Sequence, residues 1–195
     1  WIGVDASTME ANAALRNIVR RDTGDGYRDM PHRMAEESGI EKPSAEDLIR
    51  MDRKRKGKKL SNEDWVSKSD ADARIAKMKD GTTHLAYKPE HAVDLDTGTV
   101  VAADLHLADE GDTTTLPKTL ETAAANLEKV GAGPTEDDPA ECITDKGYHS
   151  RDGLKALEDS PWKTRISEPK RDGFCRWHGD DAARRAVTNN RTRLQ

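Results

Sequence analysis

The sequence predicts an α/β fold, a mixed β-sheet flanked by helices, on the basis of three observations. Short apolar runs rich in β-branched residues are typical of strands, and two of them, 85–95 and 99–107, flank the turn Asp96-Thr97-Gly98 as in a hairpin. Apolar residues then recur at helical spacing over about 113–130. A further apolar run, Cys142–Thr144, follows, so a helical crossover leads to another strand.

The individual elements follow from local patterns. The first strand is expected over Trp1–Ser7, and Pro89 is expected at the start or edge of its strand because proline donates no ladder hydrogen bond. The run 99–107 alternates, which predicts an apolar face toward the core and a polar face away from it. The apolar face comprises Val101, Ala103, Leu105 and Leu107, and the polar one Asp104 and His106.

The helix after the hairpin is expected to be capped by Asp112 and to end at Gly131-Ala132-Gly133-Pro134. Ser150 is expected to cap a second, short helix, and Thr164–Ser167 is a candidate fifth strand, ended by Pro169. Three strands in a meander, a helical crossover and a parallel fourth strand are the opening of the ribonuclease H-like fold.

A hydrophilic insertion interrupts this order after the first strand, over about 13–83, and is expected to be helical or irregular. Within it, Ser44 and Asp47 resemble a capping box. The core is then expected over 1–12 and 84–170, with a C-terminal basic segment over 170–195.

Composition bounds the class of protein. The chain has 195 residues, of which 35% are charged, 34% hydrophobic and 4% aromatic, and its net charge is −5, so we expect a small core with solvated appendages. No run approaches the roughly 20 apolar residues of a membrane span. The two cysteines lie far apart in the sequence, which favours reduced thiols over a disulfide. No pair of histidines has the spacing of zinc ligands, so a zinc site is not expected. A soluble, intracellular protein is expected, and the absence of an initiator Met suggests a piece of a longer one.

Four blocks of the sequence resemble, in order, the DDE-type transposases encoded by bacterial insertion sequences. None of the blocks is specific alone, and their joint order and spacing carry the resemblance. The blocks are Val4–Asn12 around the first aspartate, Tyr87–Asp94, Ala108–Asp112, and Thr144–Ser150 with the Asp-Lys-Gly-Tyr motif.

The resemblance implies a DNA transposase that cleaves phosphodiester bonds and transfers strands at the ends of its element. It implies that Asp5 and Asp145 are catalytic and hold a two-metal Mg²⁺ site, in which Mn²⁺ can substitute. The third residue of the family is a glutamate on a helix after the fifth strand. Glu168, beside Pro169, does not fit that position, so this fragment alone is expected to be inactive.

Two other readings remain open. The chain could be a degenerate transposase fragment that at most binds DNA, or a different ribonuclease H-like nuclease. A strand-end aspartate is by itself more often a cap or a solvated side chain. Tyr148 and His149 could line a DNA path or serve an ordinary loop, and Asp94–Gly98 is a hairpin turn rather than a calcium loop.

The strongest charge feature of the sequence is a basic run inside the insertion, over 53–59. It could contact phosphates of double-stranded DNA, at terminal inverted repeats and target sites, although a solvated helix end would look the same. The resemblance further implies self-association in a transpososome, no membrane, and a location in the bacterial cytoplasm at the nucleoid. The candidate DNA-binding residues are Arg53, Lys54, Arg55, Lys56, Lys58 and Lys59.

Overall fold

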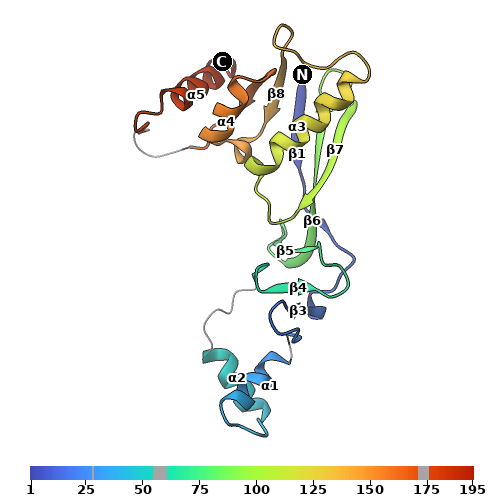
Figure 1. Ribbon diagram of the computed structural model, residues 1–195, viewed down its shortest axis with the longest axis vertical. Helices are drawn as coiled ribbons and strands as arrows, with labels where there is room; N and C mark the ends of the chain where they lie inside the picture. The colour runs from blue at the N-terminus through green and yellow to red at the C-terminus, as the bar shows by residue number, and fades with distance from the viewer. Residues whose placement is uncertain (28, 55–60, 171–175) are drawn as a thin grey trace. The chain divides into compact units, whose positions relative to one another are not determined.

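The computed structural model describes residues 1–27, 29–54, 61–170 and 176–195 (Figure 1). The chain divides into two compact units. Unit 1 comprises 1–7, 88–106 and 110–195, and unit 2 comprises 8–87 and 107–109. Among the described residues, no helix combines the length and apolarity needed to cross a membrane.

The described elements follow in chain order. They are β1 (Ile2–Ala6), β2 (Met9–Glu10), the 3-10 helix η1 (Leu15–Asn17), β3 (Ile18–Arg20), α1 (Met30–Glu37), α2 (Ala45–Lys54), β4 (Trp65–Ser67), β5 (Arg74–Lys77), β6 (Thr83–Asp94), β7 (Val100–Leu107), α3 (Asp112–Glu128), β8 (Ala140–Thr144), the 3-10 helix η2 (Lys146–Tyr148), α4 (Arg151–Glu158), β9 (Trp162–Ile166) and α5 (Asp181–Arg193).

The sheet of unit 1 has the mixed order expected of the ribonuclease H-like fold. Strand β7 pairs with β6, β6 runs antiparallel to β1, and β1, β8 and β9 are parallel neighbours. The expected adjacency of the Asp5 strand and the strand leading to Asp145 is therefore confirmed. Asp94–Thr99 forms the expected hairpin turn, in which the Asp94 N–H donates to the Thr99 carbonyl (2.8 Å).

One apolar core holds unit 1 together. Val4 of β1 packs with Leu116 and Leu120 of α3, and the same cluster includes Leu154 of α4 and Val187 of α5. The predicted helix after the hairpin thus covers one face of the sheet, and Figure 1 shows α3 lying along β1 and β7. Ser150 caps α4 as expected, because its side chain accepts a hydrogen bond from the Gly153 N–H (2.9 Å).

The prediction of which face of β7 is buried is wrong: the inner and outer faces are exchanged. Ala102 and His106 are buried, whereas Leu105 is 58% exposed. The face with the polar residue is the inner one because α3 provides a hydrogen-bonding partner there: the His106 imidazole Nε2 lies 3.1 Å from Thr119 Oγ1. A buried polar side chain is tolerated when it is hydrogen-bonded.

Pro89 also differs from expectation, because it lies inside β6 rather than at its start, and β6 is not an edge strand of the sheet. It sits between the residues of β6 that pair with β1, which begin at Glu90, and those that pair with β2, which end at Tyr87. The Pro89 carbonyl still accepts a hydrogen bond from the Ser7 N–H (3.0 Å).

Unit 2 contains the predicted insertion and has more regular structure than expected. Besides α1 and α2 it includes the β3–β4 ribbon and β5, which pairs with β6. The capping box of α2 is present, since Ser44 and Asp47 bond reciprocally (3.2 Å each way). A separate core supports the unit, formed by Ala11, Ile18, Met30, Trp65, Ala73 and Leu85.

Candidate active site

Asp5 lies near the end of β1 with its side chain exposed. It is paired across the antiparallel ladder with His91 of β6. Its neighbours Val4 and Ala6 point the other way in the strand, and Val4 is buried in the core. The Asp5 carboxylate Oδ1 accepts a hydrogen bond from the Ala6 N–H (2.9 Å), so one oxygen is held by backbone.

Asp145 directly follows β8 and is the N-cap of η2. Its Oδ1 accepts a hydrogen bond from the Gly147 N–H (2.7 Å), and its side chain is exposed. In the parallel pair of β1 and β8, Ile2 aligns with Cys142 and Gly3 with Ile143. Continuing that register brings Asp145 level with Asp5.

The two aspartates line one hollow of about 720 Å³ on the sheet surface of unit 1. Within the described parts of the chain, no hydrogen bond or ion pair engages Oδ2 of Asp5 or of Asp145. The lining residues are Gly3, Val4, Asp5, Ala6, Ser7, His91, Val93, Leu95, Ile143, Thr144 and Asp145.

The two carboxylates of Asp5 and Asp145 form the kind of open site that Mg²⁺ uses. Mg²⁺ takes hard oxygen ligands, keeps several waters and is commonly held by one or two carboxylates. Asp5 and Asp145 offer two such carboxylates in a hollow with room for water. No group of three or more His, Cys, Asp or Glu side chains that could hold a metal occurs among the described residues.

Asp112 was expected to cap α3 and instead forms an ion pair with Lys88. The N-cap of α3 is Gly111, and among the described residues no side chain caps the helix. The Asp112 carboxylate Oδ1 instead lies 2.6 Å from the ammonium Nζ of Lys88, a buried residue of β6. Sequence reasoning missed Lys88 and also Glu90, which is 0% exposed. The available signal was that both share a strand face with the small Ala92, which is buried as well.

Tyr148 and His149 do not line an exposed path, because both are buried. The Tyr148 hydroxyl donates to Glu90 Oε1 (2.9 Å). Burial raises the pKa of Tyr148 well above its usual range, and the charge of Glu90, with smaller contributions from Asp112 and Asp5, raises it further. The hydroxyl therefore stays protonated and serves as a fixed donor inside unit 1.

The basic run is only partly described. Arg53 and Lys54 form the last turn of α2, where cations interact favourably with the helix dipole. The candidates Arg55, Lys56, Lys58 and Lys59 lie outside the described residues. Their contact with DNA stays a prediction.

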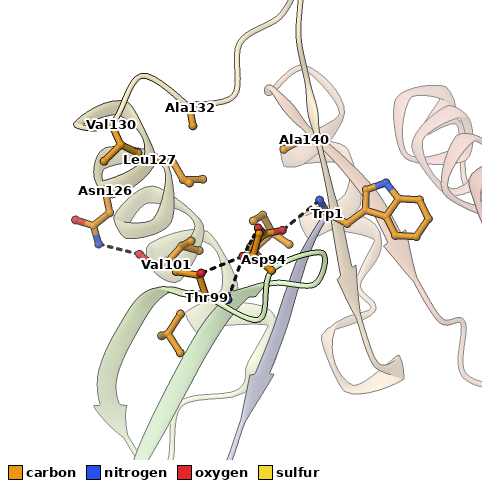
Figure 2. Close-up of a pocket in the computed structure, with 12 residues that line it drawn as sticks. Trp1, Asp94, Thr99, Val101, Asn126, Leu127, Val130, Ala132 and Ala140 are labelled. Carbon is orange, nitrogen blue, oxygen red and sulfur yellow. Dashed lines mark hydrogen bonds and ion pairs between the residues drawn. The ribbon is translucent and has the colours of Figure 1, made fainter.

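A second hollow, of about 580 Å³, lies between the end of α3 and the hairpin of β6 and β7, beside Trp1 (Figure 2). Its one carboxylate, Asp94, is used by the hairpin: Oδ2 accepts from the Thr97 hydroxyl (2.6 Å), which lowers the Asp94 pKa. Asn126 of α3 donates to the Val101 carbonyl (2.9 Å), as Figure 2 shows. The remaining lining is largely apolar, so this hollow offers little for metal chemistry.

Comparison with known proteins places most of the chain in one family. A family model described as "Transposase DDE domain" matches residues 29–193, most of the chain. The matched range includes Asp145 and begins after Asp5. No curated protein matches the chain. No solved structure matches it.

Proposed function

The chain belongs to the family of transposase DDE domains, and we propose that it contributes two catalytic carboxylates, Asp5 and Asp145, to DNA cleavage and strand transfer at element ends. The family implies an enzyme that transfers phosphoryl groups on DNA. The observation that carries the proposal is the placement of the two aspartates, which lie at the ends of neighbouring parallel strands and line one hollow.

In this proposal Asp5 and Asp145 hold Mg²⁺ through their carboxylate oxygens, and Mn²⁺ can replace it. The bound ions would activate the attacking hydroxyl or water and neutralise the leaving oxygen. The chain's own contribution is orientation: backbone N–H groups of Ala6 and Gly147 fix one oxygen of each carboxylate.

A third carboxylate is proposed to come from outside residues 1–195. Glu168 is a poor candidate because both of its oxygens are bound by Arg191, each at 2.7 Å, in a bidentate ion pair. The helix that follows β9, α5, has no glutamate in its sequence. Residues 1–195 alone are therefore expected to bind metal weakly and to show no detectable cleavage. An inactive fragment that only binds DNA is the alternative.

Double-stranded DNA is the proposed partner, with terminal inverted repeats as its specific sites and a transpososome as its working assembly. The basic run that starts at Arg53 supplies positive charge in a chain that is otherwise acidic. Phosphate contacts of this kind give affinity that is independent of sequence and sensitive to salt.

The first prediction tests the metal centre. The chain is titrated with Mn²⁺, and the concentration of free aquated Mn²⁺ is measured by electron paramagnetic resonance. The titration should detect weak binding. Asp5→Asn or Asp145→Asn should each abolish it, because the amide keeps the shape but loses the charge. Asp137→Asn, in the exposed loop before β8, is the matched control and should bind like the wild type.

The catalytic proposal is tested on a protein that also carries a helix-borne glutamate after residue 195. With Mg²⁺ it should nick a duplex that contains the element end, and either Asn substitution should abolish nicking. Cleavage that survives Asp5→Asn or Asp145→Asn would refute the catalytic assignment. Robust cleavage by residues 1–195 alone would reveal a third carboxylate within this chain.

A further inference from the structure

We infer that Glu90 is a positioning residue for Asp145, acting through a buried polar network that holds the turn after β8. The inference rests on the proposed function, since it concerns the carboxylate that would bind the metal. All residues of this network belong to unit 1.

Glu90 itself makes the case for a dedicated network. Its carboxylate is 0% exposed, and burying a carboxylate is costly unless donors satisfy it. Three hydroxyls surround it: Thr115 Oγ1 donates to Oε1 (2.8 Å), Thr119 Oγ1 donates to Oε2 (2.5 Å), and the Tyr148 hydroxyl donates to Oε1 (2.9 Å). Two of these donors come from α3, and the third comes from η2.

Lys88 supplies the compensating charge. Its Nζ lies 3.9 Å from Glu90 Oε1, donates to Thr115 Oγ1 (2.9 Å) and pairs with Asp112 Oδ1 (2.6 Å). The cation thus lies between a fully buried carboxylate and one at the start of α3. The arrangement ties β6 to α3 by hydrogen bonds to charged groups, which are the stronger class.

The network touches the Asp145 turn at two points. The first is the hydrogen bond from Tyr148 to Glu90. The second is the close approach of Asp112 to Gly147: a Cβ on Gly147 would lie 2.7 Å from Asp112 Oδ2 and 3.0 Å from Asp145 Oδ1. Only glycine leaves room for both carboxylates at this position.

The consequence concerns the orientation of the Asp145 carboxylate. The Gly147 N–H that holds Asp145 Oδ1 belongs to the turn that Tyr148 anchors. Without the anchor, the turn gains freedom and the carboxylate loses its fixed direction. A purely structural network would stabilise unit 1 without controlling Asp145, and this difference is measurable.

The experiment compares Tyr148→Phe with Tyr87→Phe. Tyr87 also donates its hydroxyl to a carboxylate, Asp70 Oδ1 (2.6 Å), but it belongs to unit 2, so it is a matched control. Two quantities are measured on the 195-residue chain: amide hydrogen exchange of Gly147 by nuclear magnetic resonance, and Mn²⁺ affinity. Tyr148→Phe should speed Gly147 exchange and weaken Mn²⁺ binding, each by roughly tenfold, whereas Tyr87→Phe should change neither.

A second variant guards against a loss of folding in Tyr148→Phe. Gly147→Ala changes an exposed turn and leaves the core intact, so it should fold and still weaken Mn²⁺ binding, because the added methyl group, 3.0 Å from Asp145 Oδ1, displaces that carboxylate. Unchanged Gly147 exchange in folded Tyr148→Phe, or wild-type Mn²⁺ affinity in Gly147→Ala, would overturn the positioning role. If the wild-type chain binds no Mn²⁺, the proposed function fails, and Gly147 exchange still decides the positioning role.

Discussion

At the scale of single residues, burial decides the chemistry of Cys142, a thiol on β8 that faces the core. Its side chain is 0% exposed, and burial together with the negative charge of Glu90 raises the pKa of the thiol to about 12. A thiol with such a pKa is inert at neutral pH, because the thiolate is the reactive form. The expectation of a reduced cysteine is consistent with this position in the fold.

The raised pKa of Cys142 predicts a pH dependence of stability. The folded chain binds the thiol proton more tightly than the unfolded chain, whose thiol has the ordinary pKa of about 9. The stabilisation is complete below about pH 9 and is lost as pH rises toward about 12, with a slope of up to about 1.4 kcal/mol per pH unit.

Urea unfolding at several pH values from about 8 to about 11 tests this prediction. The free energy of unfolding should fall more steeply with pH for the wild type than for Cys142→Ala. The variant is expected to lose about 1 kcal/mol at neutral pH from the lost packing, so the slope and not the absolute value is the readout. Parallel curves would show that Cys142 does not titrate differently in the two states.

At the scale of elements, a buried amide of α5 bonds the backbone of the edge strand β9. Asn190 is 0% exposed, and its side chain bonds Ile166 twice. Asn190 Oδ1 accepts from the Ile166 N–H (2.9 Å), and Nδ2 donates to the Ile166 carbonyl (2.8 Å). The side chain therefore takes the place of a neighbouring strand at that residue, since both backbone groups of Ile166 are paired.

Replacing this amide should be costly. Asn190→Ala leaves the N–H and the carbonyl of Ile166 buried without partners, and we expect a loss of about 2–4 kcal/mol in the free energy of unfolding. Asn189→Ala is the control, because that side chain is only half-buried and bonds Glu158, so its loss should stay near 1 kcal/mol. Equal losses in the two variants would contradict the role assigned to Asn190.

At the scale of the whole molecule, the distribution of charge matters more than its sum. The net charge is −5, yet six of the seven residues 53–59 are basic. An acidic chain that binds DNA needs a local positive surface, because counterion release by phosphate contacts provides most non-specific affinity. This run is the strongest candidate in the sequence.

Neutralising the run should weaken binding to any duplex and flatten its salt dependence. The variant replaces Arg53, Lys54, Arg55, Lys56, Lys58 and Lys59 by Ala, and binding is measured by fluorescence anisotropy at several salt concentrations. A charge-preserving variant, in which the four lysines become Arg, should keep the slope. An unchanged salt slope in the alanine variant would show that the run is only a solvated surface.

Sequence patterns alone predicted β1, β6, β7, α3, β8, α4 and β9 in their order, and the resemblance to transposases pointed to the two carboxylates of the candidate site. These predictions rested on local signals: short β-branched runs, the Asp-Thr-Gly turn and the helical spacing before Val130. Such signals depend only on residues near one another in the sequence, so they can be recognised without the structure. The closeness of Asp5 and Asp145 followed because the expected fold makes the strand of Asp5 and the strand before Asp145 parallel neighbours, as β1 and β8 are.

The burial of polar residues could not be predicted from the sequence. Lys88, Glu90 and His106 read as surface residues of two strands, yet α3 covers them and Tyr148 reaches Glu90 from 58 residues away. The physical reason is that a charged group is buried only where distant donors and an opposite charge compensate its lost hydration. Those partners are assembled by the fold, so the inner face of β7 and the anchor of the Asp145 turn emerge only in three dimensions.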